Sequence, residues 1–240
     1  MTKLIVFDTE TTCLDYEKLE IWQLSGMKIN LNTKEVEKFN YKFKTNNPLS
    51  FEARKRCNII QETIDTYDVF DKSILIDSLE LNEKDVIYLG HNVSFDRNAI
   101  KGVLSRDDKL WESKYLNLLN DDLWIDTLRL TKYVYNSVIV EDISGSNPIS
   151  YALDYLFHYL HLYKVEDNLN FHDAIFDVEI TWRLFKHLCQ ELKLNINNIQ
   201  EIVNLSNKPI KLTYINFGKY KGEKFIDIFK KDKSYLKWLS

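Results

Sequence analysis

The feature that most constrains this chain is an apolar run near its start that carries two acidic residues at alternate positions. The run is "KLIVFDTETT", residues 3–12, and its acids are Asp8 and Glu10. It predicts a buried strand over residues 3–7, and residues two apart in an extended chain point to the same face. Two carboxylates held together at the end of a buried strand repel one another and lose hydration, which a divalent cation would offset. A strand end that already lies in water is the alternative, and it needs no metal.

A third acid falls on the apolar face of a predicted helix. The segment "HNVSFDRNAIKGVL" has helical periodicity over residues 93–104, with Asn92 as the N-terminal cap. The inward face then contains Asp96 and four apolar residues, Val93, Ile100, Val103 and Leu104. A salt-bridged acid, favoured by the helix dipole, is the alternative interpretation of Asp96.

A fourth acid follows the same pattern late in the chain. The segment "FHDAIFDVEITWRLFKHL" predicts a helix over residues 173–193, and Asp177 falls on its apolar stripe while Glu179 and Arg183 point outward. His172 precedes this helix, five residues before Asp177. An isolated histidine is usually a surface residue, but one placed about a turn from an inward acid is a candidate for chemistry.

Together, four acids from three separated segments occupy positions that face the predicted core. A core does not tolerate four unpaired carboxylates, whereas oxygen ligands suit Mg²⁺ or Mn²⁺. The sequence therefore predicts a site for a pair of divalent cations, with His172 beside it. No basic residue is evident at this site, so the metals would neutralise its charge.

The rest of the chain predicts a mixed sheet covered by helices, which is an α/β fold. Strands are expected over residues 20–29, 35–43 and 85–92, and helices over 112–136, 149–163 and 173–193. Residues 50–80 predict mostly helical or irregular structure. An Asn-rich stretch over 195–207, followed by Pro209, predicts a domain boundary.

Three motifs of this chain resemble those of the DEDDh-type 3′–5′ exonucleases. "FDTETT", "HNVSFD" and "HDAIFD" occur in the order and spacing of that family, and the resemblance covers roughly residues 1–190. "WIDTLRL" and "SYALDYL" are also similar to segments that recur between its second and third motifs. The resemblance implies a ribonuclease-H-like mixed sheet flanked by helices.

The family's roles carry over where the motifs match. Asp8, Glu10, Asp96 and Asp177 would hold two metal ions, and His172 would be the general base. Cys13 occupies a position that is usually glycine in the family. The remaining motif positions would contact substrate; they are Thr9, Thr11, Leu14, Asn92 and Phe95.

The end of the chain is basic, unlike the rest. From Lys208 onward it has nine lysines against three acidic residues, whereas the remainder has 23 basic against 33 acidic residues. "INFGKYKGEKFIDIFKKDKSYLKWLS" is similar to the small domain that follows the nuclease in exonuclease X-like proteins. Lys219 and Lys221 in the turn "GKYKG" predict contact with nucleic acid, although a solvated lysine-rich surface is the alternative. Tyr235 and Trp238 are expected in the core of this small domain.

The predicted domains are an exonuclease domain over 1–193, a linker or helical connector over 194–211, and a C-terminal module over 212–240. Three separated cysteines are typical of a reducing compartment, and no apolar run reaches about 18–20 residues. We therefore expect a soluble cytoplasmic protein without a membrane segment. Its oligomeric state is left open.

The resemblance implies hydrolysis of phosphodiester bonds at DNA 3′ ends, with release of nucleoside 5′-monophosphates and a role in DNA repair. Single-stranded or 3′-end DNA is the expected substrate. RNA stays open as an alternative because both polymers present the same phosphate to the catalytic motifs. A non-catalytic nucleic-acid-binding module is disfavoured because all five catalytic residue types are present. Four inward-facing acids also disfavour a purely structural protein.

Overall fold

A computed structural model describes residues 3–106, 111–135, 150–165, 171–210, 214–215 and 218–239. Within these ranges a six-stranded sheet has the order β4-β3-β2-β1-β5-β6. β1 pairs antiparallel with β2 and parallel with β5, so the sheet is mixed, as predicted. The strands are β1 (Lys3–Thr11), β2 (Ile21–Asn30), β3 (Val36–Lys44), β4 (Asp68–Val69), β5 (Val86–Gly90) and β6 (Trp124–Asp126).

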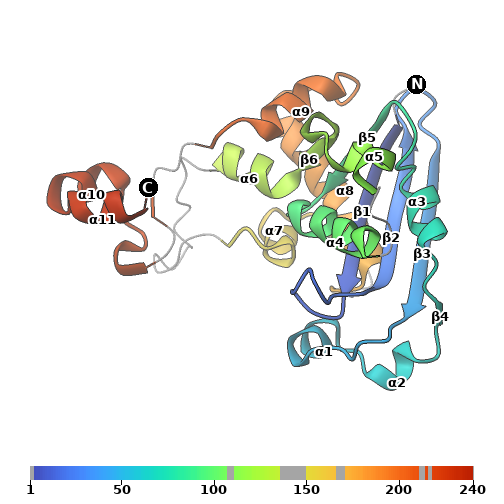
Figure 1. Ribbon diagram of the computed structural model, residues 1–240. Coiled ribbons are helices and arrows are strands. Elements are labelled where there is room, and N and C mark those ends of the chain that lie inside the picture. Colours follow the sequence, from blue (N-terminus) through green and yellow to red (C-terminus); the bar gives the residue numbers. More distant parts are fainter. Residues whose placement is uncertain are drawn as a thin grey trace.

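Helices cover both faces of this sheet (Figure 1). Those of the first half are α1 (Phe51–Cys57), α2 (Gln61–Ile64), α3 (Lys72–Ser78), α4 (Ser94–Ser105) and α5 (Trp111–Lys114). Those that follow are α6 (Thr127–Tyr135), α7 (Leu153–Tyr159), α8 (Ala174–Glu191), α9 (Ile199–Asn207), α10 (Phe225–Lys231) and α11 (Lys233–Leu239). Three short 3₁₀ turns are η1 (Leu116–Leu118), η2 (Asp121–Leu123) and η3 (Gly218–Tyr220). Among the described residues, no helix combines the length and apolar character needed to cross a bilayer.

The alternation of β1 divides the core into two clusters. Ile5 and Phe7 pack with apolar residues of α3 and α4, whereas Leu4 and Val6 pack with those of α6, α8 and α9. A central strand buried on both faces reads as a continuous apolar run, which is why "LIVF" contains no polar residue. The alternation also decides which face each later residue of β1 meets.

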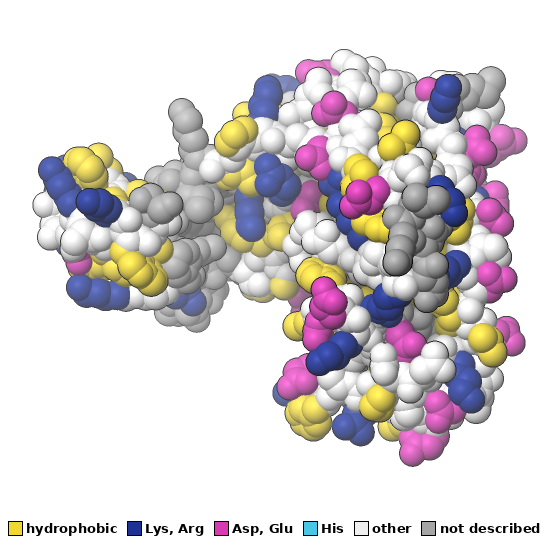
Figure 2. Space-filling model, viewed as in Figure 1, with side chains coloured by type: hydrophobic (Ala, Val, Ile, Leu, Met, Phe, Trp, Pro, Cys, Tyr) yellow, Lys and Arg dark blue, Asp and Glu magenta, His cyan; other side chains and the backbone are white. Residues whose placement is uncertain are grey.

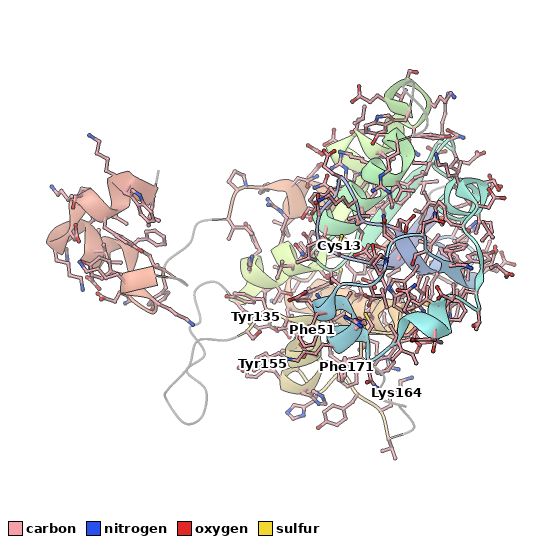
Figure 3. All side chains as sticks on the ribbon, turned by 60° about the horizontal axis from the view of Figure 1, so that its bottom comes forward. Cys13, Phe51, Tyr135, Tyr155, Lys164 and Phe171 are labelled. Atoms are coloured by element: carbon pink, nitrogen blue, oxygen red, sulfur yellow. The ribbon has the colours of Figure 1, made fainter. Side chains whose placement is uncertain are left out.

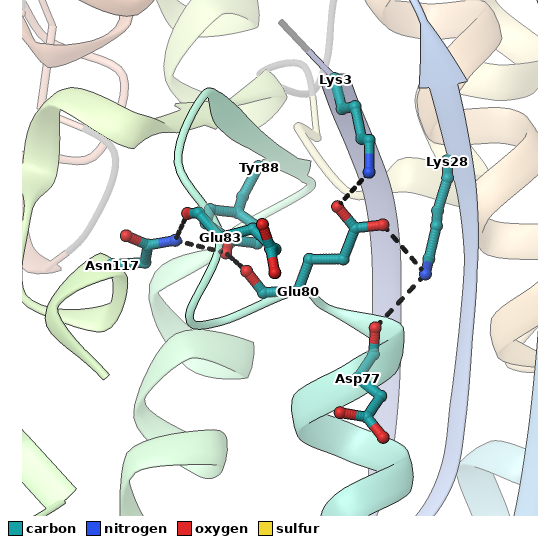
Figure 4. Close-up of polar contacts among 7 residues, drawn as sticks. All are labelled: Lys3, Lys28, Asp77, Glu80, Glu83, Tyr88 and Asn117. Atoms are coloured by element: carbon teal, nitrogen blue, oxygen red, sulfur yellow. Dashed lines mark hydrogen bonds and ion pairs between the residues drawn. The ribbon is translucent and has the colours of Figure 1, made fainter. Parts of the chain in front are cut away.

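A polar cluster fixes the start of β1, at the end of the strand remote from its acidic residues (Figure 4). Glu80 accepts from Lys3 Nζ at 2.7 Å and pairs with Lys28 Nζ at 3.2 Å. Nearby, Asn117 Nδ2 donates to the Glu83 carbonyl at 2.8 Å. The two lysines and their hydrogen bonds lower the pKa of Glu80 despite its burial. This carboxylate is therefore neutralised by protein cations.

Most predicted elements are present with shifted ends, and three differences matter. β1 continues to Thr11 because β2 lies alongside it, pairing Asp8 with Ser25 and Glu10 with Gln23. The acids therefore lie within the strand. The region 112–136 was expected to be helical, and α5 and α6 do form there, but the strand β6 lies between them. β6 is too short for its pattern to be recognised, and pairing with β5 creates it.

The third difference concerns the start of α4. Val93, not Asn92, is the N-terminal cap. Asn92 adopts φ +61°, a left-handed conformation that asparagine tolerates, and its backbone N–H donates to Asp126 Oδ1 at 2.9 Å. The predicted inward face of α4 is correct, because Asp96, Ile100, Val103 and Leu104 are buried.

The segment predicted as a linker or connector contains α9. Ile199, Ile202 and Val203 join the core cluster on the α8 side of the sheet. Ser206 Oγ accepts from the backbone N–H of Asp126 at 2.9 Å. α9 is thus packed against β6 and α6, while the proposed domain limits at 193 and 211 stay predictions.

The C-terminal module has a small core of its own. Ile215, Tyr220 and Ile228 are buried together, and Phe225, Tyr235, Leu236 and Leu239 pack against them. Figure 1 shows α10 and α11 standing apart from the sheet and its helices. Gly218 and Gly222 both have positive φ, so the expected tight turn is present. The expectation for Tyr235 is confirmed, but that for Trp238 is wrong, because its side chain is 74% exposed.

Candidate active site

β1 directs Asp8 and Glu10 to the same face of the sheet. They follow Leu4 and Val6 in the alternation, so they face α8, while Thr9 points to the opposite side. A register shift between Glu10 and Thr11 ends the regular pairing with β2. The two acids therefore lie at the end of the regularly paired part of the central strand.

The start of α4 brings Asp96 to this strand end. Its side chain is only 4% exposed, and its Oδ1 accepts from Thr9 N at 2.9 Å and from Thr9 Oγ1 at 2.6 Å. A buried carboxylate needs such partners. Thr9 thus anchors one oxygen of Asp96 beside Asp8 and Glu10.

The first turn of α8 supplies Asp177, which is 8% exposed. Asp173 caps this helix, and the backbone of His172 forms a hydrogen bond with the Asp177 carboxylate. His172 adopts φ +64°, which turns the chain into the helix. Ligand atoms of Glu10, His172 and Asp177 lie within 4.8 Å of one another.

These groups line a cavity of about 880 Å³, large enough for a small ligand. Its walls come from segments far apart in the sequence, and Figure 3 labels Cys13 and Phe171 among them. All five predicted catalytic residues line it: Asp8, Glu10, Asp96, His172 and Asp177. The structure brings together the acids that the sequence placed on inward faces.

Burial strongly favours the protonated forms of these acids. It raises the pKa of Asp8 well above its usual range, with repulsion from Asp96 and Glu10 adding to the effect. Burial also raises the pKa of Glu10 to about 8 and those of Asp96 and Asp177 to about 7. Without a cation, the site resists carrying four negative charges at neutral pH.

The donor set fits divalent metal ions. None of the ion pairs found among the described residues involves these four carboxylates. Four carboxylates, of which Asp96 and Asp177 are buried and the other two half-buried, match with one imidazole the preferences of Mg²⁺ or Mn²⁺. Glu80, which two lysines neutralise, shows the alternative that this chain uses elsewhere.

Two cations that the sequence interpretation missed line the cavity, Arg56 from α1 and Lys132 from α6. Arg56 Nε donates to His172 Nδ1 at 3.2 Å. The expectation that no basic residue lies at the site is therefore wrong. The helical spacing of Ala53, Arg56 and Cys57 on one face of α1 is the signal that could have singled out Arg56 from its basic neighbours.

A thiol also contacts the acids. Cys57 Sγ donates to Glu10 Oε2 at 3.2 Å. Burial raises the pKa of this thiol above its usual range, and the nearby Glu10 charge raises it further. Cys57 is therefore a neutral donor that orients Glu10.

His91 braces the wall of the cavity. Its ring nitrogens contact Thr127 Oγ1 and the Tyr151 carbonyl, each at 2.9 Å. Burial lowers the pKa of His91 to about 4, so the ring is neutral at physiological pH. His91 thus connects the end of β5 with α6 and with the segment before α7. The motif "HNVSFD" therefore contains a structural histidine as well as the predicted metal ligand Asp96.

The family described as Exonuclease matches residues 5–185. This chain belongs to that exonuclease family. A second family, described as Exodeoxyribonuclease X-like C-terminal, matches residues 215–240. The protein is therefore an exonuclease, a hydrolase of phosphodiester bonds, and the predicted resemblance is confirmed.

Individual relatives are distant but extensive. Exodeoxyribonuclease 10 of Escherichia coli K12 is 23% identical over 236 residues, covering 98% of this chain and 90% of that protein. A structure of exonuclease X in complex with 5′ overhanging duplex DNA is 18% identical, with a TM-score of 0.54, and covers 85% of this chain and 99% of that one. E. coli exonuclease I in complex with a dT13 oligonucleotide has a TM-score of 0.61 at 18% identity, over 80% of this chain and 43% of that one. These solved structures support the ribonuclease-H-like fold.

The predicted substrate contacts of the exonuclease divide into three groups. Leu14, Asn92 and Phe95 line the cavity, and the Leu14 side chain is 70% exposed. Thr9 and Thr11 also line it, but their hydroxyls donate within the protein, to Asp96 and to the Cys13 carbonyl. Cys13, at the position that is usually glycine in the family, does not adopt a positive φ, so its backbone does not require glycine.

The third group lies elsewhere. Lys219 and Lys221 belong to the C-terminal module and are not among the residues that line the cavity. Lys219 Nζ pairs with Asp232 at 3.4 Å, whereas Lys221 is exposed. Contact of these lysines with substrate stays a prediction, as do the individual roles of the cavity residues.

Proposed function

We propose that this exonuclease removes nucleotides from DNA 3′ ends in a reaction that requires two divalent cations and the imidazole of His172. The observation that carries the proposal is the convergence of four buried or half-buried carboxylates and one histidine in a single cavity. The products would be nucleoside 5′-monophosphates. Participation in DNA repair is the cellular role that such an activity would serve.

Asp8, Glu10, Asp96 and Asp177 would hold the cations. When bound, a pair of such ions supplies charge neutralisation for the phosphodiester, the nucleophile and the leaving oxygen. The protein's own contribution is to exclude water around the acids and to fix their directions. Thr9 does this for Asp96, and Cys57 does it for Glu10.

His172 would accept the proton of the attacking water. Burial and the Arg56 charge lower the pKa of His172, which keeps the ring neutral at physiological pH. In the present arrangement Arg56 occupies the Nδ1 lone pair, so the neutral ring carries its proton on Nε2. His172 Nδ1 can accept a proton only after the Arg56 guanidinium has moved away from it. The substrate phosphate is the group that would draw the guanidinium away, because arginine binds phosphate strongly.

DNA is favoured over RNA by one relative and by the family match over the C-terminal module. The relative matched over nearly the whole chain is an exodeoxyribonuclease, and the C-terminal match is described by the same activity. The exonuclease X and exonuclease I structures were solved with DNA. A 3′–5′ exoribonuclease would use the same catalytic groups and is the outcome that would replace this proposal.

The test uses matched single-stranded DNA and RNA oligonucleotides labelled at either end, with Mg²⁺, Mn²⁺ or EDTA. Shortening of 5′-labelled DNA in a ladder, with metal only, is expected, together with immediate release of a 3′ label as a mononucleotide. Faster RNA cleavage would assign the protein to RNA processing. Degradation from the 5′ end, or undiminished cleavage in EDTA, would contradict the polarity or the metal requirement respectively.

A further inference from the structure

We propose that the C-terminal module carries a second nucleic-acid site, in which exposed aromatic side chains stack on the bases of a single strand and lysines bind its phosphates. The inference rests on the proposed function, because it assumes a nucleic-acid substrate. It assigns the exposed ring of Trp238, together with Phe229, to binding outside the cavity.

These exposed side chains lie outside the module's buried core, although the Trp238 ring lies 5.7 Å from that of Tyr235. This core consists of Ile215, Tyr220 and Ile228 with the residues packed around them. Trp238 is 74% exposed, Ile226 57% and Phe229 50%. Three large apolar side chains left in water on fewer than 30 residues are costly to solubility, which favours a binding role.

The exposed Phe229 ring lies beside a cation. Ile226, Phe229 and Lys230 share the outer face of α10 by their spacing, and Lys233 Nζ lies 4.6 Å from the centroid of the Phe229 ring. Figure 2 shows lysine and apolar side chains next to one another on the part of the module that faces the viewer. A ring with an adjacent ammonium group presents a base-stacking surface and a phosphate-binding group together.

The charge of the module supports an anionic partner. Its described residues contain seven lysines, all exposed, and three acidic residues. Two of the acids are already engaged: Asp232 pairs with Lys219, and Glu223 pairs with Lys231. Positive charge on the outer surface that these two ion pairs do not neutralise therefore comes from Lys221, Lys224, Lys230 and Lys233.

A single strand fits this surface better than the other candidates. Bases of a duplex are stacked on each other, so exposed rings cannot reach their faces, whereas an unpaired strand offers every base. A second copy of this chain would match the charge, since the remainder of the protein is acidic, but it offers no reason for flat aromatic rings. The module would thus hold a strand that is longer than the cavity can accept.

The experiment compares the full-length protein with its Trp238→Ala, Phe229→Ala double variant. Tyr133→Ala is the control, because it removes an exposed aromatic residue from α6. Fluorescence anisotropy in EDTA measures binding of a labelled dT30 oligonucleotide, and cleavage in Mg²⁺ is compared for dT30 and for a trinucleotide. The double variant should bind dT30 about 10- to 100-fold more weakly, as expected for the loss of one or two stacked bases. Its ratio of dT30 to trinucleotide cleavage efficiency should fall by a similar factor.

Unchanged dT30 affinity in the folded double variant would overturn the proposal. So would a conversion of dimer to monomer in sedimentation without loss of dT30 binding, which would instead assign the surface to a second copy. Trp238→Phe, which keeps a stacking ring, should restore most of the affinity and excludes a folding defect as the cause. Binding in EDTA is read independently of cleavage, so an inactive protein would refute the proposed function without deciding this inference.

Discussion

In the cavity four buried or half-buried acidic side chains lie together, whereas in the C-terminal module seven lysines lie on the outside. Burial raises the pKa values of the cavity acids, and no protein cation forms an ion pair with them among the described residues. In the module, by contrast, Lys219 and Lys231 lie over the Tyr220 ring and pair with neighbouring acids. Both regions gather like charges.

The two regions compensate their like charges in different ways. Buried like charges are tolerated only if a strong counter-ion occupies the site, so the cavity should depend absolutely on metal. Exposed charges are screened by water and salt, so the module should contribute graded, salt-sensitive binding. Substitutions in the cavity should therefore have large effects on chemistry, and those in the module smaller effects on affinity or stability.

Asp8→Ala should have the largest effect on cleavage and on metal binding. Removal of this ligand is expected to lower the cleavage rate by about 10³-fold or more, since residues of one catalytic unit fail together. Isothermal titration with Mn²⁺ should show the loss of tight metal binding. Asp68→Ala, which removes an exposed acid from β4, is the control, and retained cleavage in Asp8→Ala would refute the two-metal proposal.

His172→Ala should separate chemistry from metal binding. Loss of a general base typically costs about 10²–10⁴ in rate, while Mn²⁺ binding should be largely retained because four carboxylates stay. The rate at saturating DNA and the titration with Mn²⁺ measure the two effects. His161→Ala provides a control at an exposed histidine, and normal cleavage by His172→Ala would exclude it as the base.

Arg56→Ala should change both affinity and the pH profile. Loss of a phosphate contact is expected to raise KM by about tenfold. Because the Arg56 charge lowers the pKa of His172 in the free enzyme, its removal should raise that pKa and move the acidic limb of the kcat/KM profile to higher pH. Arg54→Ala, on the same helix but outside the cavity lining, should do neither. An unshifted acidic limb would mean that Arg56 does not act on His172.

Metal should stabilise the protein more at pH 8 than at pH 6. The cavity acids have raised pKa values in the folded protein, so the folded state binds protons that an unfolded chain has released above about pH 4. Stability without metal is therefore lost as pH rises through about 7 to 8, when the buried acids ionise. Mg²⁺ offsets this repulsion, and its shift of Tm, measured against EDTA, should grow by several degrees over this range. An equal Mg²⁺-induced shift of Tm at pH 6 and pH 8 would contradict the expected pH dependence.

Tyr220→Phe should give the smallest effect and confine it to the module. Tyr220 Oη donates to Asp232 at 2.6 Å, and loss of this hydrogen bond should destabilise the module only locally, because the carboxylate is already partly exposed to water. Hydrogen exchange should increase in α10 and α11 while β1 and α8 stay protected. Increased exchange in the sheet as well would show that the two regions unfold together.

The sequence by itself determined the central strand, the inward faces of α4 and α8, and the residues of the acidic cluster. Periodicity fixes which side chains share a face, and an acid on an apolar face stands out without any structure. The three motifs then sufficed to identify the family. Short-range patterns carry this information because each concerns residues only a few positions apart.

Tertiary structure decided the rest. β6 forms only because β5 lies beside it, and α9 belongs to the core because its apolar residues meet those of the sheet. Arg56 meets His172 across 116 positions of sequence, a contact that no local pattern encodes. Trp238 was expected inside and lies outside, because in so small a module Tyr220, Tyr235 and Ile228 already fill the core. Burial and long-range contacts depend on which other side chains occupy the same space in the folded chain. A local sequence pattern does not contain that information.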